Sequence, residues 1–176
     1  MKDGSKVKIV ILAVITCLWM AVIFFFSSRD TDESTMDSNR VVTLIGRLFV
    51  RGFDEKSEQE KQEFVESISH IVRKCAHATE YAILAILSFV TISAAFSGKK
   101  SIMTRPIRIF TAWGWATVYA CTDEIHQLFV PGRSGQITDV MIDSLGAFAG
   151  ILFSLFVLWI AARRTARKQK KGLAAE

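Results

Sequence analysis

Four long apolar stretches divide this sequence, and charged residues enter three of them near one end. The stretches cover residues 7–26, 75–96, 107–127 and 140–162. Each has about the 20 residues that a helix needs to cross the hydrocarbon core of a bilayer. Helices are expected rather than strands, because a helix satisfies its own backbone hydrogen bonds in lipid. We therefore predict an all-α integral membrane protein with four transmembrane helices, which form a single domain over residues 1–176.

The composition fits a membrane protein better than a soluble one, since 51% of the residues are hydrophobic. The net charge of +5 alone would be compatible with nucleic-acid binding. However, the basic residues flank the apolar stretches and do not form a basic face with aromatic residues, so no nucleic-acid partner is predicted. Cys17, Cys75 and Cys121 show no C-x-x-C spacing, and we interpret them as small apolar fillers without a disulfide or metal role.

The first apolar stretch also needs comparison with a secretory signal peptide, because Lys2, Lys6 and Lys8 precede it. The stretch is longer than the apolar region of a signal peptide, and no small-residue cleavage site follows Phe26. We expect it to be a retained membrane helix.

Basic residues gather at alternate ends of the stretches and so predict the orientation. They are Lys2, Lys6 and Lys8 before the first, Lys99, Lys100, Arg105 and Arg108 between the second and third, and Arg163, Arg164, Arg167, Lys168, Lys170 and Lys171 in the tail 163–176. The loop between the third and fourth has only Arg133. The positive-inside rule then predicts a multi-pass plasma-membrane protein with both termini in the cytoplasm.

This orientation places the polar segment 27–74 outside the cytoplasm. Two apolar faces with helical spacing occur in it: Val41, Val42, Ile45, Leu48 and Phe49 in the first, and Phe64, Val65, Ile68, Ile71 and Val72 in the second. We expect two amphipathic helices joined by residues 52–57, which rest on the membrane or cover the outer mouth of the bundle. The alternative is a solvated loop with marginal helices.

The charges inside the stretches fall at a similar depth. With a helix rise of ~1.5 Å per residue, His77 lies ~33 Å from Lys99, and Asp143 lies ~30 Å from Arg163. Both positions are near the outer boundary of a core of ~30 Å. A charge near the bilayer centre costs at least ~2.5 kcal/mol, so such groups are usually paired or face a cavity.

Helical spacing also predicts which of these side chains meet. Asp139 and Asp143 are one turn apart on the side that carries Gly146 and Gly150, and this small-residue spacing lets another helix approach closely. The carboxylates should therefore look into the bundle. We predict that Glu80, Asp123 and Asp143 share one pocket within reach of Arg73, Lys74 or Arg133.

The loop before the fourth stretch is rich in turn-forming residues. Pro131-Gly132 predicts a tight turn. Thr138 or Asp139 is expected to cap the following helix. Arg133 is expected above the carboxylates, where it can pair with one of them.

Three ordered motifs resemble those of the VanZ-like family. They are Arg73-Lys74-Cys-Ala-His77-Ala-Thr-Glu80-Tyr81, then Asp123-Glu124-Ile-His126-Gln127-Leu-Phe-Val-Pro131-Gly132-Arg133-Ser-Gly135, and then Asp139-Val-Met-Ile-Asp143-Ser-Leu-Gly146. The resemblance covers about residues 15–155. It implies a bacterial membrane protein linked to resistance to teicoplanin, a lipoglycopeptide that acts on wall precursors at the outer membrane face. It implies no particular reaction.

Three interpretations of the charged cluster remain open. In the first, Arg73, Lys74 and Arg133 neutralise the carboxylates and only hold helices together. In the second, the cluster binds a membrane lipid, a lipid-linked cell-wall precursor or the lipoglycopeptide. The ligand-binding candidates are Arg73, Lys74, His77, Glu80, Tyr81, Asp123, Glu124, Gln127, Arg133, Asp139 and Asp143.

In the third interpretation the protein is a hydrolase or transferase that acts on a lipid headgroup by metal or acid–base chemistry. The catalytic candidates are His77, Glu80, Asp123, Glu124, His126 and Asp143. The spacing of these residues is not that of a known metal site, and no serine or cysteine lies in a nucleophile motif. The sequence names no metal ligand and no cofactor.

Overall fold

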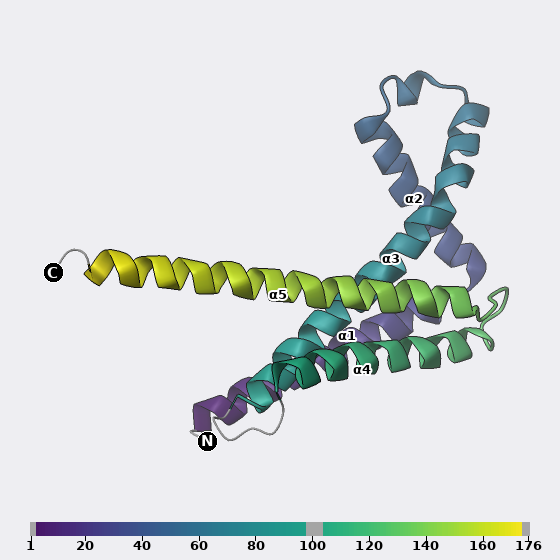
Figure 1. Cartoon of the computed structure of the whole chain (residues 1–176). Coiled ribbons are helices and arrows are strands. Elements are labelled where there is room, and N and C mark those ends of the chain that lie inside the picture. The colour runs from purple at the N-terminus through teal and green to yellow at the C-terminus, as the bar shows by residue number, and fades with distance from the viewer. Residues whose placement is uncertain (1–2, 98–103, 174–176) are drawn as a thin grey trace.

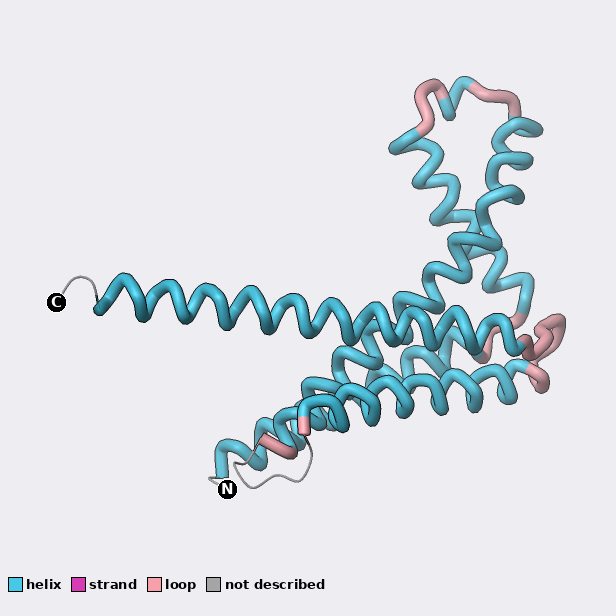
Figure 2. Tube along the Cα trace, viewed as in Figure 1, coloured by secondary structure: helices cyan, strands magenta, loops and turns pink. Residues whose placement is uncertain are grey.

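The computed structural model describes residues 3–97 and 104–173, and this part of the chain folds into helices and contains no strand. The α-helices are α1 (Asp3–Ser27), α2 (Thr31–Phe49), α3 (Glu58–Ala95), α4 (Arg105–Gln127) and α5 (Ile137–Leu173), and a short 3-10 helix η1 (Phe53–Glu55) follows α2. Figure 2 shows short loops between α1 and α2, on both sides of η1, and between α4 and α5. The predicted all-α class is confirmed. Lys2, Lys99 and Lys100 of the predicted orientation signal lie outside the described residues.

Within the described residues, three helices are long and apolar enough to cross a membrane. They are α1, α3 and α5. Helices α1 and α5 contain the predicted spans 7–26 and 140–162, and α3 contains the predicted span 75–96 except for its last residue. Helix α4 contains the fourth predicted span, 107–127, but it is not one of the three. A fourth transmembrane helix therefore remains a prediction. Helix α5 also continues past residue 162 to Leu173, so the first part of the basic tail is helical.

The second amphipathic helix and the second predicted span form one continuous helix. Helix α3 runs over 38 residues without interruption, which corresponds to about 57 Å. A capping box fixes its start: the Ser57 hydroxyl accepts from the Glu60 backbone N–H at 3.3 Å, and the Glu60 carboxylate accepts from the Ser57 N–H at 2.9 Å. No glycine or proline occurs between Glu58 and Ala95, so nothing in the backbone ends the helix at residue 74.

Helix α2 and the first half of α3 form a hairpin. The Asp30 carboxylate caps α2 by accepting from the Glu33 N–H at 2.8 Å. Buried Gly46 provides the space for the Phe53 ring of η1, because a Cβ at Gly46 would overlap that ring. Both predicted amphipathic helices are therefore present, and a solvated loop is not what this segment forms. The extracytoplasmic location of the hairpin stays a prediction.

The closest helix packing joins α3 and α5. A Cβ at Gly146 would overlap the Ala78 carbonyl oxygen, and a Cβ at Gly150 would overlap that of Ala82. The predicted close approach at the two glycines is thus confirmed, and its partner is α3. Fully buried Tyr81 lies in the core that these helices form with α1 and α4.

Partly buried hydrogen bonds hold α1 and α4 against the other helices. The Trp19 indole on α1 donates to the Glu80 carbonyl at 2.9 Å, and the Trp113 indole on α4 donates to the Ser144 carbonyl at 3.1 Å. The Tyr119 hydroxyl on α4 donates to the Met20 carbonyl at 2.8 Å. Each of these bonds joins two helices, so they fix how the helices are rotated relative to one another.

Four chain segments come together at one end of the bundle. Figure 1 shows the end of α1, the start of α2, the end of α4 and the start of α5 at the right, where α3 passes with its middle part. The C-terminal part of α5 extends away from the other helices. The charged motifs of the sequence lie on these segments, so the fold brings them to one place.

Candidate functional site

The middle of α3 contributes the first group of polar side chains to this end of the bundle. Arg73 donates from Nη2 to the Thr35 hydroxyl on α2 at 2.8 Å. One turn later, His77 Nδ1 lies 3.4 Å from Glu80 Oε2, which is an ion-pair distance if the imidazole is protonated. Arg73, His77 and Glu80 therefore lie along the side of α3 that borders α2 and the loop before α5.

Lys74 points to a different helix from its neighbour Arg73. Its ammonium group forms an ion pair with the Asp139 carboxylate in the first turn of α5. Both side chains are about a quarter exposed. Asp139 is therefore used in an ion pair, and it does not cap α5. The expectation that Thr138 or Asp139 caps the helix is wrong, because α5 already begins at Ile137.

Two cavities, each of about 180 Å³, lie on either side of three shared residues: Arg73, His77 and Arg133. The first cavity is the more polar, and its further lining residues with ionisable side chains are His70, Lys74, Glu124, Asp139 and Asp143. The second is lined by Glu80, Arg29 and Asp37 together with apolar side chains such as Phe26, Val41 and Val72. Arg73, His77 and Arg133 therefore line both a polar cavity and a more apolar cavity.

Arg133 reaches this position because of a tight turn. The Arg133 N–H donates to the Val130 carbonyl at 3.1 Å, and Gly132 has φ 73. These features define a type II turn with Pro131 at its second position, as predicted from Pro131-Gly132. The Thr31 hydroxyl at the start of α2 donates to the Gly132 carbonyl at 2.6 Å and ties the turn to the hairpin.

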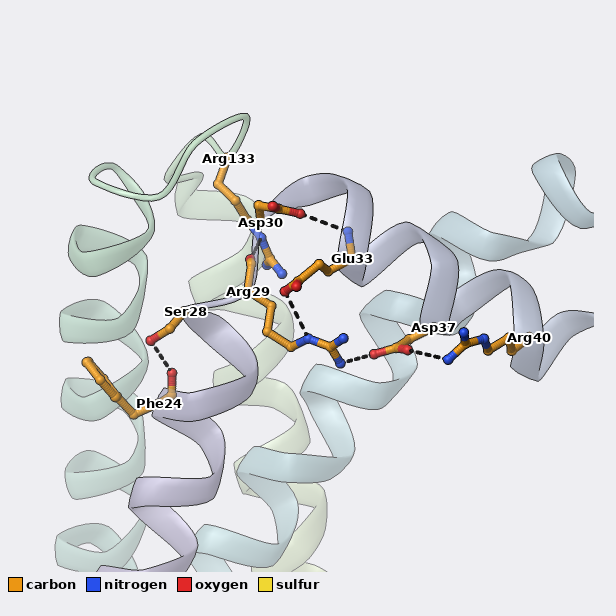
Figure 3. A network of polar contacts seen from close by, with 8 residues as sticks. All are labelled: Phe24, Ser28, Arg29, Asp30, Glu33, Asp37, Arg40 and Arg133. Carbon is orange, nitrogen blue, oxygen red and sulfur yellow. Dashed lines mark hydrogen bonds and ion pairs between the residues drawn. The ribbon is translucent and has the colours of Figure 1, made fainter.

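The Arg133 guanidinium forms no ion pair with a carboxylate of the described residues. Its Nε donates to the Arg29 carbonyl at 3.1 Å, at the turn between α1 and α2. Figure 3 shows Arg133 reaching from the loop toward Arg29 and Asp30. Burial and the neighbouring Arg73 guanidinium lower the pKa of Arg133. An arginine pKa starts so far above neutral that the group stays charged.

Arg73 and Arg133 border both cavities without an ion pair to a described carboxylate. Neither has an Asp or Glu oxygen within 4.0 Å, and Arg73 Nε is buried without a hydrogen-bond partner. The predicted pairing of Arg133 with a carboxylate is therefore wrong. Nearby Arg29 is instead fully engaged, with Glu33 at 3.3 Å and with Asp37 (Figure 3). Sequence reasoning missed Arg29, because it follows the first span without a recognisable motif.

The three carboxylates expected in one pocket do not all line the same cavity. Asp143, which is 2% exposed, lines the first cavity, and Glu80 lines the second. Asp123 lines neither of them and accepts from the Gln127 amide at 3.3 Å. The prediction that all three share one pocket is therefore not met, and Arg73 and Arg133 border the two cavities that Asp143 and Glu80 line. Their helices converge as expected, but the helix rotations direct the side chains to different spaces.

The remaining candidates have individual positions. Glu124 lines the first cavity and accepts from the Gln136 N–H at 2.8 Å, just before α5. His126 Nε2 lies 3.1 Å from the Ser28 hydroxyl, and the ring contacts Phe24. Tyr81 lines neither cavity, and its buried hydroxyl has no hydrogen-bond partner in the described part of the chain.

The described residues contain no group of three or more His, Cys, Asp or Glu side chains placed to hold a metal ion. What the arrangement offers chemically is a pair of guanidinium groups at the boundary of two cavities. Guanidinium groups bind phosphate and carboxylate oxygens with charge-assisted hydrogen bonds, often two at a time. Hydroxyl and amide groups from Thr31, Ser134 and Gln127 lie in the first cavity and can bind further polar atoms.

Comparison with known proteins gives one positive result. The sequence model of the VanZ/LLP1 family matches residues 12–159, which include all three motifs and the residues that line the cavities. Comparisons with curated proteins and with solved structures gave no match. The match covers most of the chain and confirms the resemblance seen in the three motifs. The protein is a member of the VanZ/LLP1 family.

Proposed function

We propose that this protein binds an anionic group of an envelope lipid or lipoglycopeptide between Arg73 and Arg133, at the outer face of the bacterial plasma membrane. The observation that carries the proposal is the state of the two arginines. They lie next to each other, line both cavities and have no carboxylate within 4.0 Å among the described residues.

Energetics favour an anion at this position. Two neighbouring guanidinium groups repel each other, and each has lost part of its hydration. Leaving a buried charged donor unsatisfied costs several kcal/mol in general. A phosphate or carboxylate would accept from Arg73 Nε, which has no partner among the described residues, and would compensate both charges. An internal ion-pair network would instead require the arginines to contact carboxylates.

The two cavities suggest an amphiphilic ligand. The second cavity has the apolar side chains Phe26, Val41 and Val72 on its wall, which suits the start of a hydrocarbon tail. The first has Gln127 and Ser134, which suit sugar or amide groups. A lipid-linked wall precursor carries a phosphate between such parts. Membership of the VanZ/LLP1 family supports the link to teicoplanin-type lipoglycopeptides, whose carboxylate is the second possible anion.

The orientation belongs to the same proposal. We propose four transmembrane helices, including α4, with both termini in the cytoplasm and the cavities at the outer face.

A membrane-impermeant thiol reagent added to intact cells is expected to label Gln59→Cys on the hairpin and to spare Thr165→Cys on the tail. Both positions are exposed. Because Cys17, Cys75 and Cys121 are also exposed, the test needs a background without them. Labelling of Thr165→Cys alone would place the cavities at the cytoplasmic face.

Anion binding is tested with purified full-length protein and two short-chain lipids, a phosphatidic acid and the phosphatidylcholine with the same tails. We expect saturable binding of the phosphatidic acid and much weaker binding of the zwitterionic lipid. Arg73→Gln or Arg133→Gln should each weaken the phosphatidic acid affinity roughly tenfold or more, since hydrogen bonds to charged groups contribute about 1.5–3 kcal/mol. Isothermal calorimetry or native mass spectrometry provides the dissociation constant.

The matched control is Arg164→Gln, which removes an exposed arginine on α5 far from the cavities and should leave the affinity unchanged. An equal loss of phosphatidic acid affinity in all three variants would indicate a general effect of net charge. Equal affinity of wild-type protein for both lipids would refute the anion site.

A further inference from the structure

The C-terminal half of α2 exposes a row of large apolar side chains. The exposed fractions are 56% for Leu44, 67% for Leu48 and 81% for Phe49. The opposite face of the helix, with Val42 and Gly46, is buried in the hairpin. The exposed row therefore does not contribute to holding the hairpin together, and in water its burial by another surface would be favourable.

The same part of the hairpin is strongly basic. Residues 38–53 contain Arg40, Arg47 and Arg51 and no acidic residue. The Arg40 side chain is 80% exposed and the Arg47 side chain is 60% exposed. Both have an acidic neighbour, Asp37 at 3.6 Å and Asp54 at 3.0 Å, respectively. Exposed pairs of this kind contribute little stability, so the guanidinium groups can turn to another anion at small cost.

The second helix of the hairpin has the opposite charge. Residues 58–66 contain Glu58, Glu60, Glu63 and Glu66, all exposed, and one lysine. Figure 1 shows that the hairpin leaves the bundle sideways, with the end of α2 on the side toward the C-terminus of α5 and the start of α3 on the other side. The hairpin thus has one basic, apolar side and one acidic side.

We infer that the exposed face of residues 40–51, which form the end of α2 and the two residues after it, lies on an anionic lipid surface of the membrane that the bundle crosses. Apolar side chains of an amphipathic helix enter the boundary between headgroups and acyl chains, while arginines beside them bind lipid phosphates. The acidic start of α3 then faces water, away from the negative surface. A symmetric contact of two copies through this face would place arginines against arginines, which favours lipid over such a dimer. The acidic start of α3 selects which side of the hairpin faces the membrane. This inference does not depend on Arg73 and Arg133.

The test uses the full-length, cysteine-free protein with an environment-sensitive fluorophore at Leu48→Cys, and with the same label at Glu63→Cys as the control. The protein is reconstituted into vesicles of phosphatidylglycerol or phosphatidylcholine that contain a lipid with a nitroxide near the headgroup. In phosphatidylglycerol, we expect a blue shift and strong nitroxide quenching at Leu48→Cys and neither at Glu63→Cys. Both positions are exposed, so the label should not disturb the fold.

Arginine variants examine the charge contribution. Because each arginine near an anionic surface contributes about 1 kcal/mol, Arg40→Gln and Arg51→Gln should each lower the ratio of docked to free hairpin roughly fivefold. Circular dichroism of each variant checks that helicity is unchanged. Three results would overturn the inference. The first is equal quenching of the two labels by aqueous iodide, and the second is an equal fluorescence of the Leu48→Cys label in the two lipids. The third is protection of the Leu48→Cys label from iodide only at high protein density, which would indicate contact with a second copy of the chain.

Discussion

Alanine at Gly146 or Gly150 is expected to destabilise the protein by roughly 1–3 kcal/mol per substitution, the usual range for forcing an extra methyl group into a tightly packed interface. A Cβ at either position would overlap a backbone carbonyl oxygen of α3, at Ala78 or Ala82. Backbone atoms cannot turn aside as a flexible side chain can, so α3 and α5 must separate. The loss is measured as a lower midpoint of thermal unfolding in detergent and as lower abundance in the membrane.

Gly114 in α4 provides the matched control for this prediction. Nothing lies within 4 Å of a Cβ at this position, so Gly114→Ala should be neutral or slightly stabilising because alanine favours the helix. If Gly146→Ala and Gly114→Ala unfold at the same temperature, then α3 and α5 do not pack as described.

Expression of this chain in a susceptible Gram-positive host is expected to raise tolerance to teicoplanin-like lipoglycopeptides more than tolerance to vancomycin-like drugs without a lipid tail. The double change Arg73→Gln with Arg133→Gln should remove the effect, because both cavities lose the two guanidinium groups that they share. The measurement is the minimal inhibitory concentration of each drug, with protein abundance determined in parallel.

The abundance of the double variant in the membrane distinguishes a binding role of the two arginines from a structural role. Normal abundance with lost tolerance supports anion binding, whereas abundance that falls in step with tolerance would mean that the arginines mainly stabilise the fold. Arg164→Gln on the tail should behave as wild type. If expression of the wild-type chain leaves the tolerance unchanged, this family member does not act in drug resistance. The anion site is then tested by the lipid-binding measurement alone.

The sequence predicted the helices better than their boundaries. Long apolar runs identify α1, α3 and α5 directly, because run length relates to membrane thickness. The continuity of α3 was missed, since the change from an amphipathic to an apolar pattern at residue 74 looked like a boundary. The absence of glycine and proline from Glu58 to Ala95 was the available signal for one helix.

The sequence predicted which residues lie near one another at the site, but not which side chains contact each other. Spacing along each helix correctly brought His77, Asp143 and Arg133 to one end of the bundle. Which carboxylate meets which cation depends on how the helices are rotated, and single-helix periodicity does not contain that information. For that reason Lys74 pairs with Asp139, while Arg133 donates to a backbone carbonyl.

The central claim is that Arg73 and Arg133 hold an anion together, and arginine-specific chemical protection tests it most directly. Purified full-length protein is treated with phenylglyoxal in the presence of the short-chain phosphatidic acid or of the matching phosphatidylcholine, and the modified arginines are mapped by mass spectrometry. We predict that the phosphatidic acid protects Arg73 and Arg133 together and leaves exposed Arg164 reactive, while the phosphatidylcholine protects none of them. Equal modification of Arg73 and Arg133 with either lipid would contradict the account.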